Sequence, residues 1–151
     1  MMQIGDKLPN FLGTNQNDEP VYGSAYLGKK LVLYFYPKDN TSGCTAEARN
    51  LRDNYDELRK AGYEVVGVSI DSALSHQKFI TKNQLPFDLI SDTEKTLVEH
   101  FGVWGEKKLY GRTYMGVFRT TFIFNEEGVL ERIFKPKEIT VSNHANQILN
   151  K

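Results

Sequence analysis

The feature that most constrains this chain is the run Leu31-Val32-Leu33-Tyr34-Phe35-Tyr36, which predicts a strand buried on both faces. Pro37 ends that strand because proline cannot donate a backbone hydrogen bond. A helix is predicted over about 44–61, since hydrophobic residues recur there at alternating spacings of four and three: Cys44, Ala48, Leu51, Tyr55 and Leu58. Gly62 is the predicted stop of this helix. The chain therefore passes from a buried strand into a helix within a few residues.

The other predicted elements continue this alternation. They are a strand over 64–70, a helix over 75–83, a strand over 87–90, a helix opened by a capping box at Ser91-Asp92-Thr93-Glu94 and running through Phe101, strands over 118–124 and 129–134, and a closing helix over 140–150. The last two strands form a predicted hairpin. Residues 1–30 predict turns with short strands near Phe11 and Val21, and the glycine-rich segment 102–117 predicts a loop.

The order of these elements, β-α-β-α-β-α-β-β-α, predicts an α/β fold. We expect a mixed central sheet, largely parallel at first, with flanking helices on its faces and antiparallel strands added by the late hairpin. A β-α-β start and a β-β-α finish is the layout of the thioredoxin fold, here with an insertion. The length suits one domain, which we expect to span residues 1–151.

Composition narrows the classes of partner. Nineteen basic and nineteen acidic residues cancel to a formal charge of zero, so nothing favours binding to nucleic acid or to a membrane surface. No apolar run is long enough to span a bilayer, and the first residues lack the apolar core of a signal peptide. A single cysteine excludes an intrachain disulfide. We therefore expect a cytoplasmic protein with no nucleic-acid and no membrane partner.

Cys44, the only cysteine, is predicted to lie in or beside the first turn of a helix. Unpaired backbone N–H groups and the positive end of the helix dipole point there and favour thiolate over thiol. The alternative is structural, because a free cysteine is also a small buried hydrophobe, and Cys44 falls on the apolar face of its helix. We expect the thiol to point inward, to be partly exposed and to act as a nucleophile.

The spacing Pro37-x-x-x-Thr41-x-x-Cys44 resembles the signature of the peroxiredoxins. Further segments resemble the bacterioferritin comigratory protein, or peroxiredoxin Q, subfamily, and together they cover essentially the entire chain: 35–39, 41–48, 101–107, 111–116 and Arg119-x-x-Phe122. The resemblance implies a thioredoxin-like fold and a thiol-dependent peroxidase. Such an enzyme reduces hydrogen peroxide and organic hydroperoxides through a sulfenic acid, here on Cys44. It implies no metal and no cofactor.

The resemblance also assigns roles to Thr41, Pro37 and Arg119. The position of Glu47, one turn beyond the cysteine, suggests a further role, and each of the four residues has a plainer alternative. The Thr41 hydroxyl would contact the peroxide, or only cap the helix. Pro37 would shield the cysteine, or only end the strand. Arg119 would be a permanent cation beside the sulfur, or an ordinary surface arginine. Glu47 would orient a neighbouring cation, or complement the helix dipole as a first-turn acid.

One position departs from the subfamily pattern. Many members carry a second, resolving cysteine five residues after the first, and Arg49 occupies that position here. We therefore expect a one-cysteine form, recycled by an external thiol such as thioredoxin, glutaredoxin or a small thiol. Two chains joined through Cys44 are the alternative route. We expect a monomer, with a dimer as the alternative.

Other classes of protein fit the sequence less well. A disulfide oxidoreductase needs C-x-x-C, and position 47 is Glu. A Cys–His hydrolase or a metal site would draw on His76, His100 and His144, which lie in no motif. Segment 102–116 has no nucleotide-binding glycine pattern. The alternative from another class is a non-catalytic binding or chaperone-like module with an inert Cys44, which peroxide reactivity of the thiol would distinguish from an enzyme.

Overall fold

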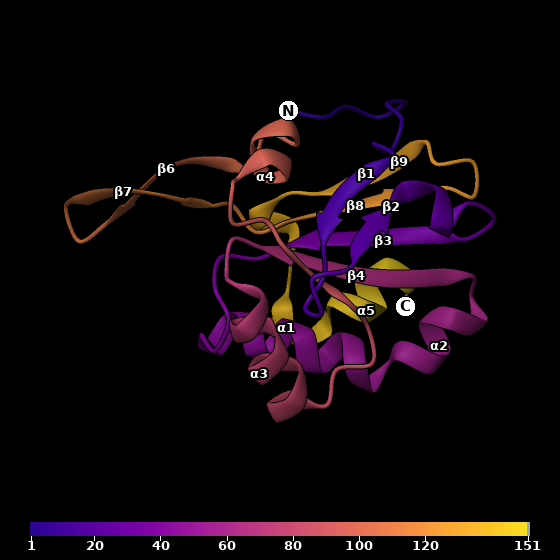
Figure 1. Ribbon diagram of the computed structural model, residues 1–151, viewed down its shortest axis with the longest axis horizontal. Coiled ribbons are helices and arrows are strands. Elements are labelled where there is room, and N and C mark those ends of the chain that lie inside the picture. Colours follow the sequence, from indigo (N-terminus) through magenta and orange to yellow (C-terminus); the bar gives the residue numbers. More distant parts are fainter. Residues whose placement is uncertain (151) are drawn as a thin grey trace.

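A five-stranded sheet forms the centre of the computed structural model, which describes residues 1–150 (Figure 1). Its strand order is β5-β4-β3-β8-β9. The strands are β3 (Lys30–Phe35), β4 (Tyr63–Ser69), β5 (Leu89–Ser91), β8 (Thr120–Phe124) and β9 (Leu130–Phe134). Strands β3, β4 and β5 run parallel, whereas β8 and β9 pair antiparallel. This arrangement confirms the predicted mixed sheet with a late hairpin.

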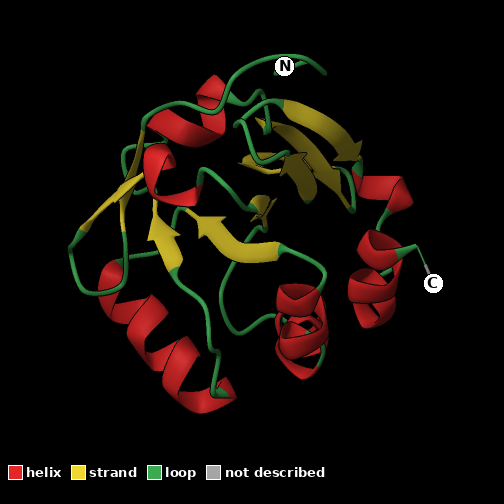
Figure 2. Cartoon of the chain, turned by 90° about the vertical axis from the view of Figure 1, so that its right-hand side faces the viewer, coloured by secondary structure: helices red, strands yellow, loops and turns green. Residues whose placement is uncertain are grey.

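Side chains of β3 alternate between two separate cores because successive residues of a strand point to opposite faces. Leu31, Leu33 and Phe35 belong to one core, and Val32 and Tyr34 to the other. The second core is covered by α1 (Ser42–Asp53), α2 (Tyr55–Lys60), α3 (Ala73–Asn83) and α5 (His144–Leu149). The first core is covered by α4 (Thr96–His100) and the small sheet of β1 (Phe11–Thr14) and β2 (Pro20–Tyr22). Figure 2 shows helices on both sides of the strands.

The helix predicted over 44–61 is two helices. Asn54 separates α1 from α2 with φ −110° and ψ 14°, and its Nδ2 atom donates to the Asn50 carbonyl over 2.9 Å. A short polar side chain that bonds the local backbone offers an alternative to a continuous helix. The hydrophobic spacing runs straight through this break, so spacing alone could not reveal it. Gly62, at φ +91°, follows the end of α2, as predicted.

The segment predicted as a loop, 102–117, contains a β-hairpin. Strands β6 (Trp104–Leu109) and β7 (Arg112–Val117) pair antiparallel and project from the body of the molecule (Figure 1). Tyr110 and Gly111, at φ 50° and 77°, form the two-residue turn with the left-handed backbone such hairpins prefer. Most of the hairpin is exposed or partly exposed on both faces, so the sequence lacks the alternation that marks a half-buried strand.

Two predicted helix starts also differ in detail. The capping box Ser91–Glu94 is wrong, because α4 begins after Lys95. The carboxylate of Asp92 accepts from the backbone N–H groups of Leu97 and Val98 instead. The closing helix begins as a 3-10 turn over Val141–Asn143 before α5. Within residues 1–150, none of the helices combines the length and apolar character needed to cross a bilayer.

Candidate active site

The antiparallel pairing of β3 with β8 places the end of β3 beside the start of β8. Phe35 at the end of β3 lies opposite Thr120 at the start of β8, because these strands are antiparallel. After β3 the chain passes through Pro37 and enters α1, whose third residue is Cys44. Arg119 immediately precedes β8. The topology therefore places Arg119 and the first turn of α1 at the same edge of the sheet.

Cys44 is buried, with only 2% of its surface exposed, so the thiol is less accessible than the expected partial exposure. The Nη2 atom of Arg119 lies 3.2 Å from the Cys44 Sγ atom. A guanidinium at this distance donates a charge-assisted hydrogen bond to sulfur and favours the thiolate. Arg119 is thus a site residue in geometry, and not an isolated surface arginine.

Glu47 lies on the other side of the same guanidinium. Its Oε1 atom accepts from Arg119 Nη1 over 2.5 Å, and the side chain is completely buried. Glu47 is the sixth residue of α1, beyond its first turn, so the alternative role as a first-turn acid is wrong. Burial raises the pKa of Glu47 to about 7, although the Arg119 charge and hydrogen bond act in the opposite direction.

Arg119 remains a cation between these two acids. Burial alone would lower its pKa, but Glu47 and Cys44 outweigh burial and raise the value further. Gly43 leaves room for the guanidinium, since a Cβ atom at that position would lie 3.3 Å from Arg119 Nη2. No local sequence pattern indicates this packing role, because it depends on Arg119, 76 residues further along the chain.

Thr41 and Pro37 lie in the segment that leads from β3 into α1. Thr41 is the N-cap residue of α1 by backbone geometry, but its hydroxyl makes no capping bond. The hydroxyl donates to the Lys38 carbonyl over 2.8 Å, which corrects the alternative of a simple side-chain cap. Pro37 is partly exposed and directly follows β3. The Thr41 side chain is exposed, so its hydroxyl remains accessible from solvent.

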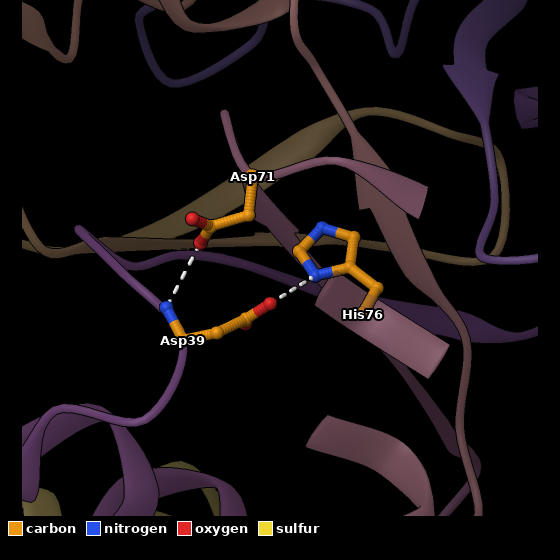
Figure 3. A group of neighbouring side chains, drawn as sticks. All are labelled: Asp39, Asp71 and His76. Atoms are coloured by element: carbon orange, nitrogen blue, oxygen red, sulfur yellow. Dashed lines mark hydrogen bonds and ion pairs between the residues drawn. The ribbon is translucent and has the colours of Figure 1, made fainter. Parts of the chain in front are cut away.

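The segment between Pro37 and Thr41 is fastened to the body of the protein by Asp39, which sequence reasoning missed. Asp39 Oδ2 lies 2.8 Å from His76 Nδ1, and its backbone N–H donates to Asp71 Oδ2 over 2.8 Å (Figure 3). Two hydroxyls also donate to the Asp39 carboxylate. Tyr36 Oη donates to Oδ1 over 2.6 Å, and Ser75 Oγ donates to Oδ2 over 2.8 Å. The cluster holds the active-site segment in one position.

His76 lies between two acceptors at the centre of this cluster. Nδ1 faces Asp39, and Nε2 lies 3.1 Å from the Ile90 carbonyl oxygen. Burial alone would raise the pKa of Asp39, but His76 and the neighbouring hydroxyls outweigh burial and lower it. Asp39 and His76 are therefore a buried hydrogen-bonded pair within a larger network.

The atoms of Asp39, Asp71 and His76 are close enough together to hold a metal ion (Figure 3). Sequence reasoning treated His76 as scattered and missed this grouping. The same atoms are already engaged with each other and with Ser69, whose Oγ donates to Asp71 Oδ2 over 2.8 Å. A hydrogen-bond network accounts for these contacts fully. His100 is exposed at the end of α4, and His144 bonds Thr121 and Gln147, so no histidine of the described chain bonds Cys44.

A second cation faces the site from the hairpin. Lys107 Nζ donates to the Val117 carbonyl over 2.8 Å and lies 5.7 Å from the centre of the Phe118 ring. Burial and the nearby Arg119 charge lower the pKa of Lys107, while Cys44 opposes them. The sequence predicts a loop here, so no periodic pattern distinguishes Lys107 from the neighbouring cations.

Comparison with known proteins identifies the group to which this arrangement belongs. The family model described as "AhpC/TSA family" matches residues 4–133. The chain belongs to the AhpC/TSA family. Peroxiredoxin Bcp of Escherichia coli K12 is 41% identical over 149 residues, which are 99% of this chain and 94% of that protein. This relative confirms the resemblance to the peroxiredoxins.

Solved structures agree with this membership of the peroxiredoxins. A mutant of PrxQ from Xylella fastidiosa matches with a TM-score of 0.88 and 31% identity, over 99% of this chain and 94% of that one. The bacterioferritin comigratory protein of Xanthomonas campestris, described with its alkyl peroxide reduction activity, matches with a TM-score of 0.84 and 32% identity over 96% of both chains. The predicted thioredoxin-like fold is confirmed.

The chain is therefore a peroxiredoxin of the Bcp and PrxQ group and a thiol-dependent peroxidase. Its substrates are peroxides, and its reductants are thiols. The alternative of a non-catalytic module with an inert cysteine is set aside by this membership. The roles of the individual residues are a separate question, which the geometry around Cys44 addresses.

Proposed function

We propose that Cys44 is the peroxidatic nucleophile of this enzyme. The Cys44 thiolate attacks one oxygen of the peroxide, an S–O bond forms, and the O–O bond breaks. The sulfur is oxidised to a sulfenic acid, while the other oxygen leaves as hydroxide or alkoxide and is protonated to water or alcohol. The observation that carries this proposal is the 3.2 Å contact between Arg119 Nη2 and Cys44 Sγ.

Arg119 is the electrostatic partner in this reaction. Negative charge moves from sulfur to the departing oxygen in the transition state, and a fixed cation beside that path stabilises the charge. The ion pair with buried Glu47 fixes one edge of the guanidinium and directs the other edge toward sulfur. Glu47 accordingly acts as a positioning residue.

Thr41 and Pro37 form the polar and apolar sides of the entrance. The Thr41 hydroxyl is held by the Lys38 carbonyl, and its oxygen still has lone pairs with which to accept from a peroxide O–H. Pro37 has no backbone N–H and excludes water without competing for the substrate. The buried contact of Asp39 with His76 links this segment to α3.

The reductant is an external thiol, because the chain has no second cysteine to attack the sulfenic acid. Thioredoxin, glutaredoxin and small thiols are the candidate reductants, and a monomer in the cytoplasm is the form we propose. Organic hydroperoxides join hydrogen peroxide as proposed substrates, by analogy with the alkyl peroxide reduction of the Xanthomonas relative.

A turnover assay tests this proposal. The protein is mixed with hydrogen peroxide or an organic hydroperoxide and a panel of thiol reductants, and peroxide loss is followed. We expect turnover with at least one thiol, a gain of oxygen on Cys44 by mass spectrometry when reductant is omitted, and no activity in Cys44→Ser. Continued turnover by folded Cys44→Ser would show that the chemistry lies elsewhere. A dominant disulfide-linked dimer would show that a second chain resolves the sulfenic acid.

A further inference from the structure

Two acids in this site share one hydrogen-bonded cation. Arg119 donates through Nη2 to Cys44 and through Nη1 to Glu47, so the guanidinium lies between the thiol and the carboxyl group. One positive charge balances one anion. If Cys44 and Glu47 were both ionised, the trio would hold one uncompensated negative charge in a buried site, which is strongly unfavourable.

The two oxygens of Glu47 differ in their surroundings. Oε1 accepts from Arg119, whereas Oε2 is buried with no hydrogen-bond partner within the described residues. A buried carboxylate with one oxygen unpaired loses its hydration without replacement. Placing a proton on Glu47 removes the charge while keeping the bond from Arg119 to Oε1. When the two acids hold one proton between them, the proton therefore belongs on Glu47, and Cys44 is the thiolate.

Resting on the proposed role of Cys44, we propose that Cys44 and Glu47 share one proton, which Glu47 holds while Cys44 is a thiolate and releases when the sulfenic acid forms. Glu47 is then a proton store for the peroxidase reaction as well as a support for Arg119. The raised pKa of Glu47, about 7, agrees with this arrangement, because it places the carboxyl group within reach of either state near neutral pH.

The step balances without a proton from solvent. Sulfur gives an electron pair to one peroxide oxygen, the O–O bond breaks, and hydroxide leaves. The sulfenic acid is neutral, so Arg119 then has only Glu47 as an anionic partner, and the carboxyl group ionises. Glu47 releases one proton, and hydroxide needs one proton to become water, so the two changes cancel. The trio has the same net charge before and after the reaction.

The other titratable groups around Glu47 do not replace it as the proton store. Tyr34 on β3 is completely buried, and its hydroxyl has no hydrogen-bond partner among residues 1–150. Burial, followed by the nearby Glu47 and Cys44, raises its pKa well above its ordinary value of 10.0. Burial lowers the pKa of His144 on α5 to about 4, so this ring is neutral. Lys107 on the hairpin adds positive charge that favours the thiolate. Asp39 is ionised and bound to His76.

The test follows one round of oxidation with a single equivalent of peroxide in weak buffer, at a pH about one unit above 7. At that pH Glu47 beside a neutral sulfur is ionised, whereas a neighbouring Cys44 thiolate raises the carboxyl pKa further and keeps the proton on Glu47. Proton uptake is read with a pH indicator, and infrared difference spectra report protonated carboxyl groups. Wild type is compared with Glu47→Gln and with Glu126→Gln, which changes an exposed acid in the β8–β9 turn. We expect wild type and Glu126→Gln to lose a carboxylic-acid band and to take up close to zero protons per sulfur. Glu47→Gln should lack the band and take up one.

Each outcome separates the two proposals. A wild-type protein that gains oxygen on Cys44 but takes up one proton per sulfur, with no loss of a carboxylic-acid band, overturns the proton store and leaves the peroxidase proposal standing. A protein that gains no oxygen on Cys44 contradicts the peroxidase proposal itself. If Glu47→Gln fails to fold, the wild-type proton count and spectrum still decide the question, because both are measured on the unaltered enzyme.

Discussion

Arg119 Nη2 lies 3.2 Å from Cys44 Sγ, although 75 residues separate them in sequence. The contact exists because β3 and β8 are antiparallel, so the start of β8 lies beside the end of β3. The guanidinium is fixed on two sides, by the ion pair with Glu47 and by the close approach over Gly43. A donor held in this way loses little freedom when negative charge develops beside it, which is the condition for electrostatic catalysis.

Arg119→Met should reduce peroxide reactivity on the order of 10²-fold, as the loss of one fixed charge-stabilising donor does elsewhere. Methionine keeps most of the volume and removes the cation. The rate of Cys44 oxidation is measured with stopped-flow fluorescence or competition for peroxide. Arg112→Met, on the exposed hairpin, is the matched control and should change the rate little. A tenfold or smaller loss would reduce Arg119 to a structural role.

Gly43→Ala tests the same contact without removing any charge. Alanine in a helix is favoured over glycine by about 1 kcal/mol, so the variant should fold at least as stably as wild type. Its Cβ atom would lie 3.3 Å from Arg119 Nη2, and the guanidinium must shift by a few tenths of an ångström. We expect a several-fold slower oxidation of Cys44, with a free energy of urea unfolding no lower than that of wild type. An unchanged rate would mean that the guanidinium position is not critical.

Much of the fold, but less of the site, could be predicted from sequence. The strand 31–36 and the following helix start were evident because hydrophobic spacing reports burial directly. The contact of Asp39 with His76 spans 37 residues and depends on how α3 packs against the segment after β3, which no local pattern encodes. Arg119 was predicted only through resemblance to a family, since an arginine before a strand carries no local signal. The Asn54 break was hidden by an uninterrupted hydrophobic spacing.

His76→Leu should destabilise the protein by about 1–3 kcal/mol, because it leaves the buried Asp39 carboxylate without one of its hydrogen-bond partners. The double variant Asp39→Asn with His76→Leu removes that charge and should recover part of the loss. Free energies of unfolding are measured with urea at neutral pH. Equal losses in the single and double variants would show that the contact between Asp39 and His76 is not what supports the segment between Pro37 and Thr41.

Stability should also depend on pH through Glu47. Its pKa rises from 4.5 in the unfolded chain to about 7 in the fold, so its contribution is complete below about 4.5 and declines as the pH rises through 7. At 1.36 kcal/mol per pKa unit, the total is about 3 kcal/mol. Cys44→Ser and its double variant with Glu47→Gln, which both lack the thiol, are compared by urea unfolding across this range. The double variant should lose this decline, and parallel curves would contradict the raised pKa.

Arg49→Cys tests whether α1 can open after oxidation. Arg49 is exposed, and its Nε donates to Asn83 Oδ1 over 2.9 Å, which links α1 to α3. Two sulfurs five residues apart on an intact helix lie on different faces and are too distant for a disulfide. We expect a disulfide to form in this variant more slowly than Cys44 is oxidised, because the first turns of α1 must unwind first.

Burial of one face of α1 opposes its opening, and oxidation of Cys44 favours it. Cys44, Glu47 and Ala48 are buried on one face of α1, and the unwound helix would expose them. Oxidation removes the thiolate and with it the strongest attraction between Cys44 and Arg119. One equivalent of peroxide is added to Arg49→Cys and to the control Arg49→Ser, which also lacks the bond to Asn83. Cysteines are mapped by mass spectrometry over time. If only Cys44 sulfenic and sulfinic acids appear while the introduced thiol stays free, α1 does not open, and the natural enzyme depends on an external thiol because of its structure as well as its single cysteine.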